Sequence, residues 1–167
     1  SEDQLRQSES FLAQGRGTAL SLLGRLSEAQ QAYERSAATL GEAAHPFQAS
    51  LIEDLGRLAL QQGTFDDADV YYRRAYELYL QFASPEAWSE IVGPEEASSA
   101  ADRSREGAAR VLANRAQVAL QRGDREAFLQ LQLEAIDVAR EHGFADLAQS
   151  LRLNLYTWKL HWDVRGA

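Results

Sequence analysis

The most constraining feature of the sequence is a pattern of small and aromatic residues that returns after a constant interval. The two copies are 39 residues apart (56 − 17) and consist of Gly17, Gly24, Ala29 and Tyr33, then Gly56, Gly63, Ala68 and Tyr72. Two helices pack closely only where small side chains let their backbones approach, and a large ring fills the space beside them. A hairpin of this kind cannot bury its apolar face alone, so neighbouring hairpins must stack.

Helical periodicity continues through the rest of the chain, and turn signals divide it into segments. The sequence predicts about seven long helices in antiparallel pairs, with one irregular insertion over about residues 84–99. Within this insertion, Ser84 and Pro85 are expected to start a short helix that Gly93 and Pro94 end. We expect Ser27 to cap the second helix. A break is expected next, because His45 precedes Pro46 and is steered away from helical geometry.

In the second copy, the order of residues resembles the tetratricopeptide repeat, whose signature is W-x2-L-G-x2-Y followed by A-x3-F and a small residue. The matching residues are Leu55, Gly56, Ala68, Tyr72 and Ala75. Ile52 and Ala59 stand where the family usually has Trp and Tyr. A third, weaker copy covers about residues 109–142. There Phe128 and Gln132 take the places of the alanine and the ring, or a shorter turn puts Ala127 and Leu131 there.

The resemblance implies an all-α fold: a right-handed superhelix, or α-solenoid, of about three hairpins plus a C-terminal capping helix. We expect one domain over residues 1–167. Its expected parts are repeat 1 at about 10–43, repeat 2 at about 49–82, the insertion at about 84–99, repeat 3 at about 109–142 and the capping helix at about 144–163. The interval exceeds the family's usual length of about 34 residues. It is similar to the long-helix variety found in kinesin light chain.

In this family the first helix of each hairpin lines a concave groove that holds a peptide or a partner's helix. The resemblance therefore implies a non-enzymatic protein-interaction scaffold. The groove candidates, carried over by position, are Gln14, Thr18, Glu53, Asp54, Arg57, Gln61, Arg110, Asn114, Gln117 and Gln121. The resemblance does not extend to the members that grip a chaperone's C-terminal carboxylate, because Asp54 would repel that group.

Composition argues against several other classes. The net charge of -8 repels nucleic-acid phosphate and anionic lipid, and it is compatible with a basic protein or peptide partner. The chain contains no Cys, and its three histidines do not stand at metal-ligand spacing. It carries no P-loop or other catalytic motif, so no enzyme, cofactor or metal is expected. No apolar run approaches the roughly 20 residues of a membrane helix.

The last predicted helix has two apolar rows. One row suits a cap over the third hairpin and consists of Leu147, Leu151, Leu155, Trp158 and Trp162. The second row, Leu153, Tyr156 and Leu160, is not needed for capping. It indicates a homodimer through this helix or a surface for another partner.

The chain begins with Ser1 and contains no Met, which indicates a processed protein or an excised domain. This leaves an alternative function open: a regulatory or sensor segment of a larger signalling or transcriptional regulator. The compartment stays equally open. We expect a soluble chain that is either cytoplasmic or exported after removal of a signal segment.

Overall fold

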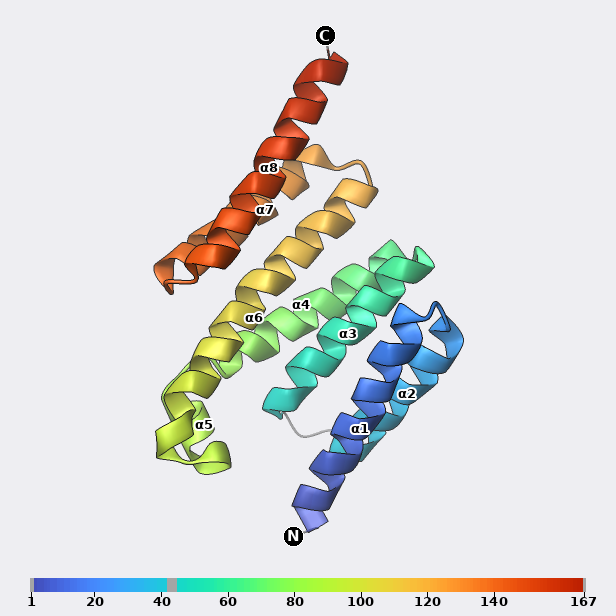
Figure 1. The fold of residues 1–167 in the computed structure, drawn as a ribbon, viewed down its shortest axis with the longest axis vertical. Coiled ribbons are helices and arrows are strands. Elements are labelled where there is room, and N and C mark those ends of the chain that lie inside the picture. The colour runs from blue at the N-terminus through green and yellow to red at the C-terminus, as the bar shows by residue number, and fades with distance from the viewer. Residues whose placement is uncertain (1, 42–44, 167) are drawn as a thin grey trace. The chain divides into compact units, whose positions relative to one another are not determined.

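In the computed structural model, the described residues, 2–41 and 45–166, form α-helices joined by short turns (Figure 1). The helices are α1 (Glu2–Leu22), α2 (Leu26–Leu40), α3 (Pro46–Gln62), α4 (Phe65–Gln81), α5 (Pro85–Val92), α6 (Pro94–Gln121), α7 (Arg125–Glu141) and α8 (Ala145–Gly166). No strand occurs among these residues. The predicted all-α class, built from helix hairpins of the solenoid type, is confirmed.

The chain divides into two compact units, Ser1–Leu78 (unit 1) and Tyr79–Ala167 (unit 2). The boundary falls inside α4, which continues as one helix across it. The single domain over residues 1–167 and the right-handed sense of the superhelix stay predictions.

The repeated glycines of unit 1 lie where the paired helices touch. A Cβ atom on Gly17 would lie 2.6 Å from the ring of Tyr33, and one on Gly56 would lie 2.8 Å from the ring of Tyr72. Both rings are only 1% exposed. The predicted packing of small against large residues is therefore present in both α1–α2 and α3–α4.

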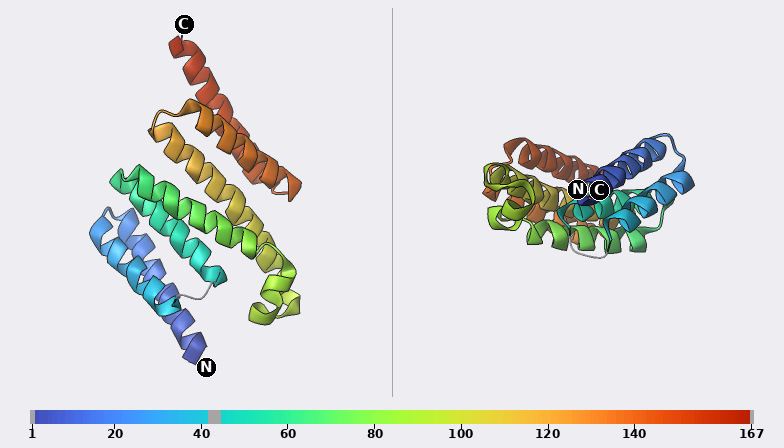
Figure 2. Two further views of the ribbon diagram at one scale, coloured as in Figure 1. Left: turned by 180° about the vertical axis from the view of Figure 1, so that it is seen from behind. Right: turned by 90° about the horizontal axis from the view of Figure 1, so that it is seen from below.

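A common core joins the first hairpin to α3, and α1 and α2 run side by side (Figures 1 and 2). The core consists of Leu20, Ala29, Ala32, Tyr33, Leu51 and Leu58. Near its edge the hydroxyls of Ser10 and Ser36 lie 2.7 Å apart and are buried. Stacking of the second hairpin on the first buries the apolar face that each would otherwise leave in water.

The helix starts follow the sequence in one case and differ in another. α3 begins at Pro46, with His45 as its N-cap. This confirms the end of the predicted break between the second and third helices. Residues 42–44 of the break lie outside the described residues. The prediction that Ser27 caps α2 is wrong, because α2 already begins at Leu26. Arg25 precedes this helix and donates two hydrogen bonds to Glu28. These bonds span the first turn, so the helix begins one residue before the position that a Ser27 cap would give.

In unit 2, the third hairpin consists of α6 and α7 and keeps the register of the second at a shift of 60 residues (123 − 63). Phe128 and Gln132 are 1% and 2% exposed, whereas Ala127 and Leu131 are half-buried. The structure thus selects the first of the two predicted alignments. Gln132, where the second copy has a tyrosine, donates to Leu151 O on α8 at 3.0 Å.

Within the predicted insertion over 84–99, the short helix expected between Ser84 and Gly93 is confirmed, but the irregular chain expected from there to about residue 99 is wrong. Ser84 and Pro85 begin the short helix α5, and α6 begins directly after it at Pro94. Proline at the first helical position favours both starts, since its missing N–H would be unpaired there anyway. The early part of α6 buries a helical row of small residues, namely Ala97, Ala100, Ala101, Ser104 and Ala108.

The C-terminal helix is confirmed, with α8 lying beside α7 (Figure 2). Phe128 of α7 packs edge-on against Trp158 and Trp162, with ring centroids 6.4 Å and 5.5 Å apart. Leu151 and Leu155 are buried on the same side of α8. This row covers the outer face of α7, as a capping helix requires.

Candidate functional site

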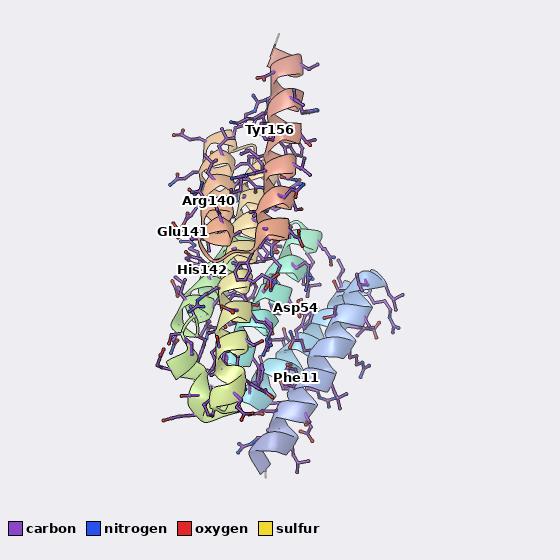
Figure 3. The ribbon with its side chains drawn as sticks, turned by 60° about the vertical axis from the view of Figure 1, so that its left-hand side comes forward. Phe11, Asp54, Arg140, Glu141, His142 and Tyr156 are labelled. Atoms are coloured by element: carbon purple, nitrogen blue, oxygen red, sulfur yellow. The ribbon has the colours of Figure 1, made fainter. Side chains whose placement is uncertain are left out.

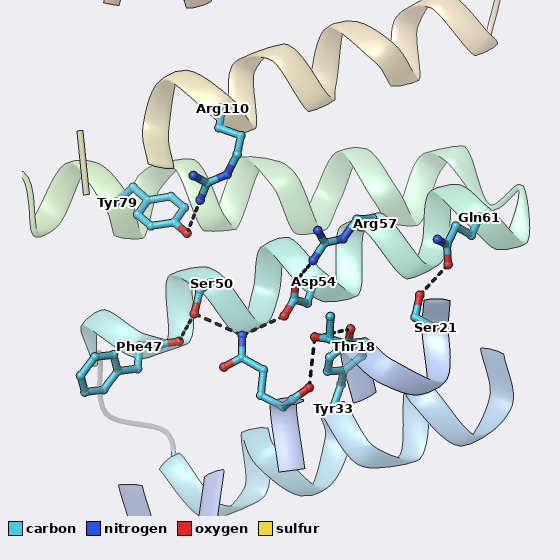
Figure 4. Close-up of polar contacts among 11 residues, drawn as sticks. Thr18, Ser21, Tyr33, Phe47, Ser50, Asp54, Arg57, Gln61, Tyr79 and Arg110 are labelled. Carbon is cyan, nitrogen blue, oxygen red and sulfur yellow. Dashed lines mark hydrogen bonds and ion pairs between the residues drawn. The ribbon is translucent and has the colours of Figure 1, made fainter. Parts of the chain in front are cut away.

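Polar side chains follow the face that α1 and α3 share in unit 1 (Figure 4). Gln14 Nε2 donates to Asp54 Oδ2 at 2.8 Å, and it lies 3.3 Å from Ser50 Oγ. Two turns farther along both helices, Ser21 Oγ donates to Gln61 Oε1 at 2.7 Å. We call Gln14, Thr18, Ser21, Asp54, Arg57 and Gln61 the polar row. Hydrogen bonds join its two helices at two levels and fix the side chains relative to one another.

The centre of the polar row is an ion pair between Asp54 and Arg57 (Figure 4). The Asp54 side chain is 11% exposed, while that of Arg57 is 51% exposed. Because Arg57 lies one turn after Asp54 on α3, its guanidinium covers the carboxylate and presents its remaining N–H groups to solvent. The pair therefore offers hydrogen-bond donors on its outer side.

Thr18 links the polar row to the hairpin core. Its hydroxyl accepts from Tyr33 OH at 3.3 Å and donates to Gln14 O at 3.2 Å. Tyr33 is the ring that packs against Gly17. The packing that closes the first hairpin thus also holds the middle of this face.

Glu53 belongs to the interior of the second hairpin. It is 6% exposed and lies near Tyr72. Burial raises the pKa of Tyr72, the charge of Glu53 raises it further, and Arg57 lowers it. Among the unit 1 candidates, Arg57 and Gln61 are exposed, Gln14 and Thr18 are half-buried, and Glu53 and Asp54 are buried.

The four candidates of unit 2 lie on α6 at intervals of four, three and four residues, which places them on one face: Arg110, Asn114, Gln117 and Gln121. Arg110 Nη2 lies 3.3 Å from Tyr79 OH at the end of α4 (Figure 4). The ring of Tyr79 also touches Gly107, where a Cβ would lie 2.5 Å away. A groove that joins these residues to the polar row of unit 1 stays a prediction.

One feature of unit 1 was not predicted. An open depression of about 740 Å³ lies between α1 and α2, and charged residues of both signs, including Arg16 and Glu28, surround it. Leu12 lies in it and is 76% exposed. The sequence held a signal for this surface, because Leu12 corresponds to Leu51 at the repeat interval, and Leu51 packs against the preceding hairpin.

The remaining candidate residues lie on α8, where Leu153, Tyr156 and Leu160 are all exposed. Figure 3 labels Tyr156 on this helix. Among the described residues, no three His, Cys, Asp or Glu side chains come together as a metal ion would require. The helices of residues 2–41 and 45–166 contain no apolar stretch long enough to cross a membrane.

Comparison with known proteins agrees with this arrangement. The sequence model of the tetratricopeptide repeat (TPR) family matches residues 49–82, the same span as the predicted second repeat. No curated protein matches the chain. Among solved structures, the chain is similar to YrrB, a TPR protein with an unusual peptide-binding site, at 21% identity. The match covers 87% of this chain and 75% of that chain, with a TM-score of 0.34. Residues 49–82 of the chain form a tetratricopeptide repeat.

Proposed function

We propose that the chain is a non-enzymatic scaffold that binds a peptide or a helix of a partner protein along the polar row of unit 1. The tetratricopeptide repeat at residues 49–82 supports an interaction module in general, since TPR proteins bind protein or peptide partners. The observation that carries the specific site is the Arg57–Asp54 pair, which presents a fixed guanidinium beside Gln14 on the shared face of α1 and α3.

The spacing of the polar row suits an extended ligand. The Gln14–Asp54 and Ser21–Gln61 contacts are seven residues apart along each helix, which corresponds to about 10 Å. An extended peptide covers about the same distance with three residues. Arg57 and Gln61 can bond the carbonyl groups of such a peptide, because each carries N–H donors. Their present hydrogen bonds reduce the side-chain freedom that binding would otherwise remove.

The partner we propose carries basic residues. The chain has a net charge of -8, so its long-range field attracts positively charged segments. Arg57 limits this attraction at the centre of the row, since its positive charge balances the negative charge of Asp54. Basic residues of the ligand therefore belong to either side of the contact with Arg57, and a backbone carbonyl or a neutral acceptor belongs opposite it.

The test is a peptide-library screen with the wild-type chain, followed by titration of the selected peptides against Arg57→Gln and Gln61→Ala. We expect each change to weaken binding about five- to thirtyfold, because each removes one or two hydrogen bonds at the ligand. The matched control is Arg73→Gln. Arg73 is exposed on α4 and pairs with Asp69 at 2.7 Å, so it is the same residue type in the same kind of pair, away from the row.

Far-UV circular dichroism of every variant checks that the helices remain formed. The proposal is contradicted when Arg57→Gln and Gln61→Ala, both folded, bind the selected peptides as tightly as Arg73→Gln does. It is also contradicted when the library yields no peptide at all.

A further inference from the structure

The exposed side of α8 carries a second apolar row that the fold does not use. Leu153, Tyr156, Leu160 and Val164 are 61%, 65%, 65% and 78% exposed. Their intervals of three, four and four residues place them on one face of the helix. The opposite face already packs on α7 through Leu151, Leu155, Trp158 and Trp162. Four large apolar side chains in a line are therefore left in water.

The register of α8 argues against covering this row with another hairpin of the same repeat. α8 matches α3 at a shift of 100 residues (150 − 50), with Ser150, Leu151, Leu155 and Leu160 where α3 has Ser50, Leu51, Leu55 and Leu60. At this shift Tyr156 takes the place of Gly56. In α1 and α3 the ring of the following helix packs directly against the glycine. A tyrosine side chain at this position occupies the space that such a ring needs.

Charges beside the row fit a second copy of the chain. Arg152 and Asp163 are both exposed, and their eleven-residue interval puts them on nearly the same edge of the row. Along the helix, Arg152 and Asp163 are centred on position 157.5, and Tyr156 and Leu160 are centred on position 158. The charged residues and the apolar row therefore share nearly the same centre. In an antiparallel pair of α8 helices, centred there, Arg152 of each copy faces Asp163 of the other. In a parallel pair the two-fold axis would put these edges on opposite sides of the seam, so Arg152 and Asp163 of the two copies would not meet.

We propose that the chain forms a two-fold symmetric homodimer by antiparallel packing of α8 on α8 of a second copy. The row Leu153, Tyr156, Leu160 and Val164 forms its centre. Two Arg152–Asp163 pairs close its edge. A surface of four side chains per copy buries on the order of 800 Å² in total, less than the roughly 1,200 Å² of a stable interface. The dimer is therefore reversible and forms only as the protein concentration rises.

The test is sedimentation velocity of the full chain over a range of concentrations. We expect the wild type to shift from monomer to dimer as concentration increases. Leu160→Glu is expected to raise the dissociation constant about a hundredfold, because it puts a charge in the middle of the apolar row. The matched control is Leu133→Glu on α7. Leu133 is 49% exposed and lies outside the row, and its change is expected to leave the dissociation constant within about twofold of the wild-type value.

Charge reversal tests the antiparallel arrangement. Arg152→Asp and Asp163→Arg are each expected to raise the dissociation constant about tenfold. The reason is that each change turns both symmetry-related Arg152–Asp163 pairs of the dimer into pairs of like charge. The double variant restores the opposite-charge pairs and is expected to return close to the wild-type value. Circular dichroism confirms that each variant remains folded. A wild type that stays monomeric at every concentration, or a double variant that dimerises no better than the single ones, overturns the proposal.

The outcome is independent of the proposed peptide site. The reversed residues lie on α8, and the peptide site lies on α1 and α3 of unit 1. Loss of dimerisation with peptide binding unchanged, or the reverse, identifies which of the two proposals fails. The homodimer is also overturned if the wild-type chain stays monomeric by itself and Leu160→Glu instead abolishes binding of another protein.

Discussion

The rings of Tyr33 and Tyr72 each fit against a glycine of the facing helix, because a glycine has no side chain to overlap the ring. Both are large rings at 1% exposure, so the helix pair can close only where the opposing residue is glycine. The third copy supports this reasoning. It has Gln132 at the position of the ring and Ala116 at the position of the glycine, and both are buried. An amide side chain is slimmer than a phenol ring, so the opposing position accommodates a methyl group.

Substitution of Gly17 tests this packing. Gly17→Ala is expected to destabilise the chain by about 1–3 kcal/mol, because the new methyl group overlaps a buried ring that cannot move aside. The matched control is Gly15→Ala on the same helix. Nothing lies within 4 Å of a Cβ at Gly15, so its change is expected to stabilise the helix by about 0.5–1 kcal/mol. Urea unfolding followed by circular dichroism measures both. Equal stability of the two variants would show that the ring adapts.

Residue-level contacts were predicted unevenly from the sequence. The glycine and tyrosine positions follow from the repeat interval, because burial imposes strict size limits there. The polar contacts of Asp54 do not follow in the same way. From the sequence it is one carboxylate on a groove wall, whereas in the structure Gln14 and Arg57 both contact it. The Arg57 pair was visible as an i,i+3 interval, but the Gln14 contact depends on the stacking of two helices.

At the level of elements, the starts and ends of helices depend on local competition between neighbouring residues. Ser27 and Asp124 are both good caps by type, yet only Asp124 accepts from the backbone, from Ala127 N at 3.0 Å. Arg25 and Glu28 decide the start of α2 instead. Similarly, the Ala- and Ser-rich segment after Gly93 was expected to be irregular. It is helical, because its small residues recur at helical intervals and are buried.

The start of α3 depends on pH. His45 Nδ1 accepts from Phe47 N at 3.3 Å, and Gln48 Oε1 accepts from His45 N in return. Burial lowers the pKa of His45 below its ordinary value of 6.5, which keeps the ring neutral and able to accept. The folded form binds this proton less readily than the unfolded form does. The stability contributed by the cap is therefore complete above about pH 6.5, and it is lost as pH falls through the lower pKa of the folded state.

His45→Asn tests this dependence. Asparagine is a good cap and does not titrate, so the variant is expected to lose less stability than the wild type between about pH 8 and pH 5. Urea unfolding at a series of pH values measures the difference. Parallel curves for the two proteins would remove His45 as the cause.

At the level of the whole molecule, charge is the property most relevant to partners. The chain carries a net charge of -8, so a basic peptide selected by the library screen is attracted over a distance of about one Debye length. Its affinity is expected to fall about tenfold between about 0.05 M and 0.5 M salt. Isothermal titration calorimetry at several salt concentrations gives the slope. An affinity that does not change with salt would contradict a basic ligand.

The fold class and the three hairpins could be predicted because one pattern of small and large residues recurs in all of them, at a shift of 39 residues and then of 60. The groove could be predicted only as a set of positions. Its candidates in unit 1 come together on α1 and α3, while those in unit 2 lie on α6 alone. Whether the two sets form one surface depends on contacts far apart in the sequence, and no periodicity encodes these. The depression at Leu12 was missed because an exposed leucine by itself is unremarkable; only its correspondence to buried Leu51 makes it informative.

Tyr156 has a consequence for how such a chain can lengthen. A further hairpin could add to α8 in the same way only if a small residue stood at the position that Gly56 holds in α3. On α8 the tyrosine side chain is there instead, 65% exposed. A hairpin with a ring at the position of Tyr72 would therefore need a smaller residue at position 156.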